Sequence, residues 1–254
     1  MKPVYHTLTL ENPKNSLIYP HRKGQNTLYM LAIADFFLDI LFPRLCLLCG
    51  KEGDVLCMEC TKKLPPANTL SIPNTFALYA YADTRVKKIL WHFKYHNGRS
   101  LAGVFAQRIY QKIAEECIFS ESSHLEAKLP SENEETKREQ ILVVSIPITW
   151  ASRWRRGFNQ STLVAQELTA LNGKFQFSPN ALTRIRGGKR QTAQKSRADR
   201  IHNMENVFAG DTSLFGRDVI VIDDVTTTGA TLREARRALL TAGAKVIYSF
   251  VIAH

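Results

Sequence analysis

Long apolar runs alternate with helical patterns over the second half of the chain. Residues 141–147, 218–223 and 245–253 are rich in Val and Ile, which is typical of strands buried on both faces of a parallel sheet. Apolar residues recur at helical spacing over residues 160–171 and 232–242. This alternation of strand and helix predicts an α/β fold in which helices cover both faces of a parallel sheet.

The first half of the chain predicts helices rather than strands. Residues 85–96 and 100–118 each carry apolar residues at helical spacing, and Asn97-Gly98 between them is typical of a turn. Residues 120–139 are polar and charged, which predicts an exposed, mobile insertion. A basic loop is expected over residues 152–160, between a strand and the helix that follows it.

The amino-terminal part contains one long apolar run, residues 28–42. Asp35 and Asp39 interrupt the run four residues apart and share one helical face, so we expect a short amphipathic helix that packs on the next segment. The run is shorter than the roughly 20 residues that a membrane helix needs, which predicts no membrane span. A helix on a membrane surface is disfavoured because its polar face is acidic. Residues 1–27 predict a loose extension.

The composition is that of a globular protein. Of the 254 residues, 44% are hydrophobic and 22% are charged, which excludes wholesale disorder, a collagen-like repeat and a multi-span membrane protein. The formal net charge of +11 favours anionic partners such as phosphates or nucleic acid without choosing between them. Because no signal-peptide layout precedes the first helix, we expect a cytoplasmic protein.

Four of the five cysteines form two CxxC pairs, Cys46 with Cys49 and Cys57 with Cys60. Each pair lets two thiolates from one tight turn reach the same ion, and two pairs complete a closed tetrahedral zinc site. Disulfides are disfavoured in a cytoplasmic chain, and four unrelated thiols are disfavoured by the paired spacing. Residues 28–66 therefore predict the amphipathic helix plus a double zinc-ribbon-like module in which zinc has a structural role.

The strongest functional signal is the segment over residues 219–232. A buried strand delivers Asp223 and Asp224 to its carboxyl end, where ligands bind in open α/β sheets. The next residues form a tight loop that opens a helix, and their backbone N–H groups and hydroxyls can converge on a phosphate. Two acids can lie beside a phosphate-binding loop if the hydroxyls of a sugar hydrogen-bond to the acids. A magnesium ion would offset the remaining repulsion between the acids and the phosphate groups. The alternative is an ordinary strand–turn–helix connection.

Residues 223–231, Asp-Asp-Val-Thr-Thr-Thr-Gly-Ala-Thr, resemble the phosphoribosyl diphosphate (PRPP) fingerprint of type I phosphoribosyltransferases. The wider chain resembles the ComF/GntX family, with further matching stretches at residues 93–99, 156–160 and 200–203. This similarity implies a parallel-sheet type I phosphoribosyltransferase-like domain over residues 67–254, with a small N-terminal four-cysteine zinc module.

The resemblance also implies roles for particular residues. Asp223 and Asp224 are the expected catalytic pair, which fixes the ribose. The segment from residue 184 to 200 corresponds to the region that is a mobile flap over the site in related enzymes, and its basic character equally suits contact with a nucleic-acid backbone. The expected contacts of PRPP, bound with Mg²⁺, are the loop residues Thr226, Thr227, Thr228, Gly229, Ala230 and Thr231 and, near the diphosphate, Lys94, Arg99 and Arg156.

Two classes of function remain open at this point. In the first, the protein is an enzyme that transfers a phosphoribosyl group to an unidentified acceptor. In the second, implied by the ComF resemblance, it is a non-enzymatic competence protein for DNA uptake that binds single-stranded DNA and a helicase-like partner. Cations interleave with Trp91, Phe93, Tyr95 and Trp154, so these rings either stack on bases or belong to the core.

Overall fold

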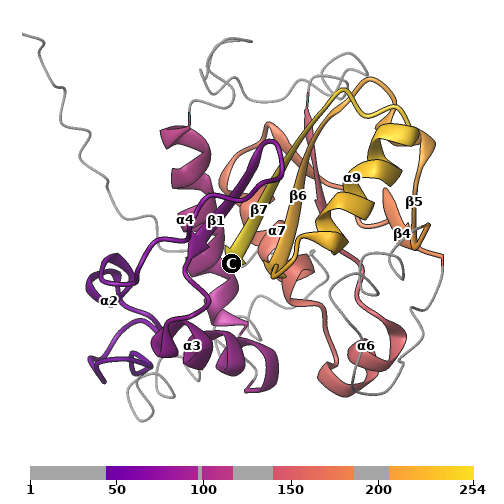
Figure 1. Cartoon of the computed structure of the whole chain (residues 1–254). Helices are drawn as coiled ribbons and strands as arrows, with labels where there is room; N and C mark the ends of the chain where they lie inside the picture. Colours follow the sequence, from indigo (N-terminus) through magenta and orange to yellow (C-terminus); the bar gives the residue numbers. More distant parts are fainter. Residues whose placement is uncertain (1–43, 97–98, 117–139, 186–205) are drawn as a thin grey trace, which may run out of the picture. The chain divides into compact units, whose positions relative to one another are not determined.

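The computed structural model of the chain (Figure 1) describes residues 44–96, 99–116, 140–185 and 206–254. The chain divides into two units, Met1–Pro43 and Arg44–His254, and every described residue belongs to the second. The predictions for residues 1–27, 28–42, 120–139 and 186–203 and for the turn at Asn97-Gly98 lie outside the described residues.

A five-stranded parallel sheet forms the centre of the described part, in the strand order β1-β7-β6-β2-β3. The three predicted strands are confirmed as β2, β6 and β7, which occupy the middle of the sheet. The outer strands β1 and β3 were not predicted from the sequence. The bounds are β1 Thr75–Tyr79, β2 Ile141–Ser145, β3 Phe175–Phe177, β6 Asp218–Val225 and β7 Val246–Ala253.

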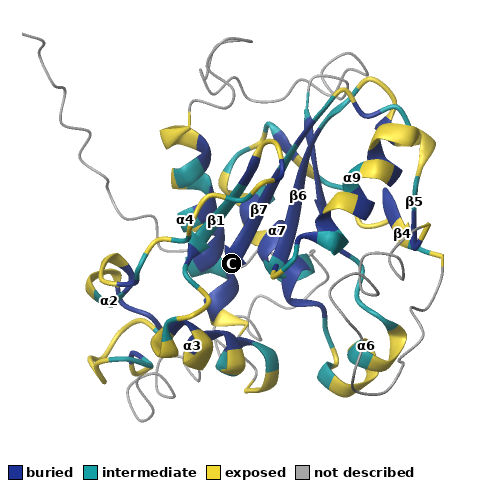
Figure 2. Cartoon of the chain, in the orientation of Figure 1, coloured by how far each residue is buried: buried dark blue, intermediate teal, exposed yellow. Residues whose placement is uncertain are grey.

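Both faces of the sheet are covered, as the sequence predicts (Figure 2). Successive residues of β6 point to opposite faces because a strand has a period of two. Ile220 and Ile222 belong to one buried cluster, which α3, α4 and α7 share, whereas Val219 and Val221 belong to a second cluster with α9. These helices run over Thr84–Tyr95 (α3), Ser100–Glu115 (α4), Gln160–Leu171 (α7) and Ala230–Thr241 (α9).

One predicted loop is wrong. Residues that were expected to be irregular form the helix α6, Trp150–Arg156. The side chain of Thr149 caps its first turn by accepting the N–H of Ser152, and Gly157 ends it with a φ of 77°. The helix has no buried residues, so it lacks the apolar periodicity by which helices are found in a sequence.

A second small sheet lies beside α9. The strands β4 (Leu182–Arg184) and β5 (Phe208–Gly210) pair in antiparallel fashion. Glu234 of α9 is buried and accepts the backbone N–H of Val207 at 2.9 Å, and Arg237 forms an ion pair with it at 2.8 Å. The buried carboxylate therefore fixes this strand pair to the main domain.

The cysteine segment packs on the same core as the sheet. Leu56 and Leu64 are buried in the cluster that contains α3 and α4. The ammonium of Lys88 donates to the carbonyl of Leu47 at 2.7 Å, which joins the segment to α3. The boundary at residues 66–67 stays a prediction. Among the described helices, none is long and apolar enough to cross a membrane.

Candidate functional site

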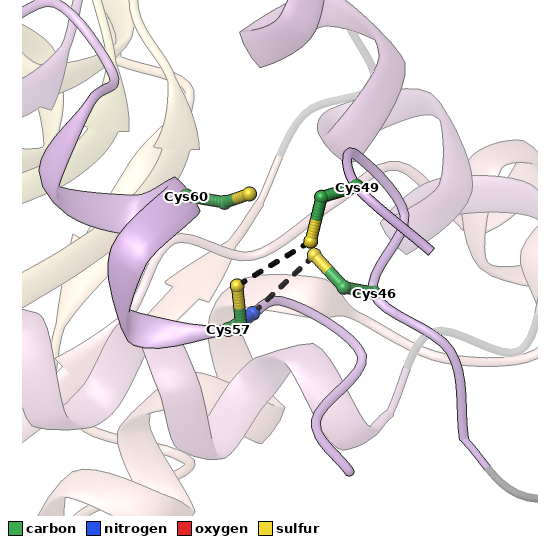
Figure 3. A group of neighbouring side chains, drawn as sticks. All are labelled: Cys46, Cys49, Cys57 and Cys60. Atoms are coloured by element: carbon green, nitrogen blue, oxygen red, sulfur yellow. Dashed lines mark hydrogen bonds between the residues drawn. The ribbon is translucent and has the colours of Figure 1, made fainter. Parts of the chain in front are cut away.

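The four cysteines of the two CxxC pairs come together in one cluster (Figure 3). Their sulfur atoms all lie within 4.8 Å of one another, and the sulfurs of Cys49 and Cys57 are 3.7 Å apart. Four thiolates about 2.3 Å from a central zinc ion are separated by about 3.8 Å in a tetrahedron. The donor set and its spacing therefore fit one zinc ion with no position left for a substrate.

Local backbone structure builds this cluster. Gly50 has a φ of 72° and donates its N–H to the carbonyl of Cys46 at 2.9 Å, which closes the turn of the first pair. Cys57 is the N-cap of the helix α2 (Met58–Lys62), so that Cys60 follows within its first turn. A tight turn and a helix start thus present the two pairs to each other, as the spacing predicts.

The two acids of the fingerprint lie at the carboxyl end of β6, as predicted. Asp223 is 7% exposed, and its Oδ1 accepts the N–H of Asp224 at 2.9 Å and the hydroxyl of Ser161 at 3.4 Å. Burial, and then the charge of Asp224, raise the pKa of Asp223 to about 8. Burial therefore favours the neutral, protonated form of Asp223 far more than in an ordinary aspartate.

Asp224 differs from its neighbour because it has a cationic partner. Its Oδ2 lies 2.8 Å from the ammonium of Lys94, at the end of α3, and the two side chains are only 17% and 20% exposed. The structure thus brings together two residues that the sequence placed in separate motifs. Lys94 contacts the acid pair itself.

The loop over residues 226–231 has the geometry of an anion-binding loop. Gly229 is the N-cap of α9 with a φ of 73°, a conformation that favours glycine. The backbone N–H groups of Thr227, Thr228 and Gly229 have no acceptor among the described residues. Free N–H groups at a helix N-terminus attract a phosphate. Ile72 packs against the loop, because a Cβ on Gly229 would lie 2.4 Å from Cδ1 of Ile72.

A cavity of about 440 Å³ opens at the carboxyl end of β2, next to the acid pair. Ser145 lines it and pairs in register with Ile222, one residue before Asp223. Its cationic residues are Arg153 and Arg184. Arg184 stands out, because its Nε and Nη1 are buried with no hydrogen-bond partner among the described residues, and burial lowers its pKa. An anion in this cavity would satisfy them.

A second, smaller hollow of about 280 Å³ collects the other predicted basic residues. The guanidinium of Arg156 lies 5.7 Å from the ring centre of Tyr95, and that of Arg99 lies 5.6 Å from the ring centre of Phe158. No acidic residue lines this hollow, which is formed by Lys94, Tyr95, Arg99, Arg155, Arg156, Gly157 and Phe158. The predicted diphosphate contacts Lys94, Arg99 and Arg156 therefore lie together in this hollow.

The aromatic residues near these cations divide into two groups. Phe93 is fully buried, so it belongs to the core. Trp91, Tyr95 and Trp154 are about half exposed or more, and Trp154 is 81% exposed. Trp150, which the sequence analysis missed, lies one helical turn before Trp154 and stacks on it with ring centres 6.3 Å apart. The (i, i+4) spacing of two Trp residues was the available signal.

Comparison with known proteins gives a consistent result. Residues 131–254 match the family model described as a phosphoribosyl transferase domain. The chain is 37% identical to the DNA utilization protein YhgH of Escherichia coli (strain K12) over 105 residues, which are 41% of this chain and 45% of YhgH. It is 31% identical to Competence protein F of Haemophilus influenzae over 110 residues, 41% of this chain and 46% of that protein. These matches span about half of each relative.

A longer similarity joins the chain to Competence protein ComFC of Bacillus subtilis (strain 168). The two are 27% identical over 214 residues, which are 82% of this chain and 77% of ComFC. This similarity extends well beyond the segment that matches the phosphoribosyl transferase model.

Proposed function

Because the chain belongs to the ComF family of phosphoribosyltransferase-like proteins, we propose that it binds PRPP or another phosphoribosyl ligand at the carboxyl edge of its sheet. The observation that carries the proposal is the loop over residues 226–231. Three of its N–H groups are free of acceptors among the described residues, at the start of α9 and next to two acids. This combination supports a ligand that has a phosphate and adjacent sugar hydroxyls.

Each part of such a ligand has matching residues. The 5-phosphate accepts the N–H groups of Thr227, Thr228 and Gly229. Asp223 and Asp224 hydrogen-bond the ribose hydroxyls. The diphosphate accepts hydrogen bonds from the guanidinium groups that line the neighbouring cavities. Its oxygens would also accept hydrogen bonds from Nε and Nη1 of Arg184, which have no partner among the described residues.

Transfer of the phosphoribosyl group to an acceptor needs little covalent chemistry from such a site. The residues hold the ribose, and the arginines stabilise the charge that grows on the departing diphosphate. We propose phosphoribosyl transfer as the activity that this arrangement supports.

The resemblance to type I phosphoribosyltransferases implies Mg²⁺ as a companion of PRPP, and the acid pair does not fit that ion. Mg²⁺ demands near-ideal octahedral geometry and is usually held by one or two carboxylates together with substrate phosphates and water. The Oδ2 atom of Asp224 is taken by the ammonium of Lys94, and burial disfavours a second negative charge on Asp223. The proposed function therefore does not depend on a magnesium ion held by the acid pair.

Titration calorimetry with PRPP tests the proposal, and Gly229→Ala is the informative variant. We expect saturable binding by the unmodified chain. Gly229→Ala should bind at least about tenfold more weakly, or about 1.4 kcal/mol, because the new Cβ strains the anion-binding loop and meets Ile72. The matched control is Gly216→Ala, which has a similar φ of 71° but no atom within 4 Å of its new Cβ. It should bind PRPP as the unmodified chain does. Absence of any PRPP binding would contradict the proposal.

A second function, binding of single-stranded DNA, is favoured by the exposed aromatic residues. Trp150 and Trp154 are 77% and 81% exposed on the basic helix α6. Stacking of bases on aromatic rings beside a cationic surface is the usual mode of single-strand binding. In this proposal the protein acts in DNA uptake together with a helicase-like partner.

Fluorescence anisotropy with a labelled oligonucleotide tests DNA binding. We expect affinity to fall steeply with salt, and Trp150→Ala with Trp154→Ala to weaken binding about tenfold or more. Phe215→Ala is the control, because Phe215 is 80% exposed but precedes β6, at the opposite edge of the sheet. Undetectable binding at low salt would exclude this function.

A further inference from the structure

The ion pair between Lys94 and Asp224 is held in place from both sides. Lys94 is the penultimate residue of α3, and the preceding residue Phe93 is fully buried in the core. On the other side, the side-chain amide of Gln160 lies 3.5 Å from the carbonyl of Lys94 and donates to it. The backbone of Lys94 is therefore held in place, and its ammonium lies within reach of the acid pair.

The charges at this edge of the sheet balance. Burial and the charge of Asp224 raise the pKa of Asp223 to about 8, which disfavours a second negative charge beside Asp224. The remaining carboxylate, that of Asp224, lies 2.8 Å from the single ammonium of Lys94. The acid pair thus has no excess negative charge that would attract a cation from solution.

A divalent cation at the acid pair would have to compete with this lysine. It would displace the ammonium from Asp224 or lie beside a like charge in a partly buried site, and both are costly. In the described part of the chain, the four cysteines are the only group of three or more side chains that can ligate a metal. Asp223 and Asp224 belong to no such group among these residues.

We propose that Lys94 takes the place of the divalent cation, as a built-in counter-ion between the acids that hold the ribose and the anionic diphosphate. Its position suits contact both with the acids and with a diphosphate. The ammonium contacts Asp224, and the same residue lines the basic hollow with Arg99 and Arg156. PRPP therefore binds to this chain without Mg²⁺. The inference rests on the proposed function, since it concerns the same ligand and the same acids.

The test compares PRPP affinity with and without Mg²⁺ by titration calorimetry on the full, zinc-loaded chain. Magnesium is removed by dialysis against metal-free buffer, because a strong chelator would also extract zinc from the cysteine cluster. The unmodified chain is compared with Lys94→Met, which keeps the length of the side chain and removes its charge. Lys87→Met is the matched control, since Lys87 lies on the same helix and packs over Tyr81, 5.7 Å from its ring centre.

We expect the dissociation constant of the unmodified chain and of Lys87→Met to change less than about threefold when Mg²⁺ is removed. For Lys94→Met, the constant should rise more than about tenfold without Mg²⁺ and recover when Mg²⁺ is added. If Lys94→Met unfolds, Lys94→Gln replaces it, and the unmodified chain alone still decides the question.

Three results would overturn the inference. PRPP binding by the unmodified chain only with Mg²⁺ would disprove it and leave the proposed function intact. Equal loss of affinity by Lys94→Met in both buffers would make Lys94 a direct ligand contact rather than a counter-ion. Absence of PRPP binding under every condition would remove the proposed function itself.

Discussion

Replacement of Cys57 by Ser is expected to release zinc and to destabilise the whole described unit. Cys57 is buried, begins α2, and has its sulfur 3.7 Å from that of Cys49. A structural zinc site contributes its binding energy to folding, so loss of one thiolate should cost about 5 kcal/mol or more. Zinc content by plasma mass spectrometry and the midpoint of thermal unfolding measure the two effects.

Cys117→Ser is the control for this experiment, because Cys117 lies outside both CxxC pairs. It should keep one zinc ion per chain. A Cys57→Ser variant that retains a full zinc ion and an unchanged unfolding midpoint would show that the four cysteines are not a metal site.

Loss of zinc should also affect the ligand site, through α3. The cysteine segment contacts this helix where Lys88 donates to the carbonyl of Leu47. Leu56 packs in the same cluster as Phe93, which directly precedes Lys94. The cysteine cluster and the acid pair are therefore connected by one helix, so a metal ion held by the cysteines would support the position of Lys94 as well as the fold.

Local patterns were sufficient to predict the central strands and the two motifs. The buried run of β6, the acids at its end and the loop before α9 are contiguous in the sequence, and the CxxC pairs are separated by seven residues. In contrast, β3 has only three residues and α6 buries none. Short or fully exposed elements lack the periodicity on which prediction depends.

The contacts that give the site its electrostatics join distant parts of the chain. Lys94 reaches Asp224 only because α3 ends at the carboxyl edge of the sheet, and Ser161 reaches Asp223 because α7 begins there. The position of the two buried nitrogens of Arg184 that have no hydrogen-bond partner among the described residues likewise depends on β4. The residue types were visible in the sequence, but their pairing depends on strand order, which no local pattern specifies.

The protonated state of Asp223 leads to a large expected effect of Asp223→Asn on stability at alkaline pH. The folded pKa of Asp223, about 8, lies above the ordinary value of 3.8. The folded state therefore binds a proton that the unfolded state has lost, and stability falls as the pH rises from about 4 to about 8. Asparagine resembles the protonated acid and carries no such penalty. At pH 9 we expect Asp223→Asn to exceed the unmodified chain by about 2 kcal/mol or more in free energy of unfolding.

Guanidinium unfolding curves at pH 5 and pH 9 measure this difference, which should be much smaller at pH 5. The charged groups that face Asp223 are Asp224, whose charge raises its pKa, and Lys94, whose charge lowers it. Asp224→Asn is therefore the instructive companion variant. It leaves the ammonium of Lys94 without its carboxylate in a partly buried site, so it should be destabilised at both pH values. A variant Asp223→Asn that is less stable than the unmodified chain at pH 9 would show that the folded state stabilises Asp223 as a carboxylate. The neutral form of Asp223 beside Asp224 and Lys94 would then be disproved.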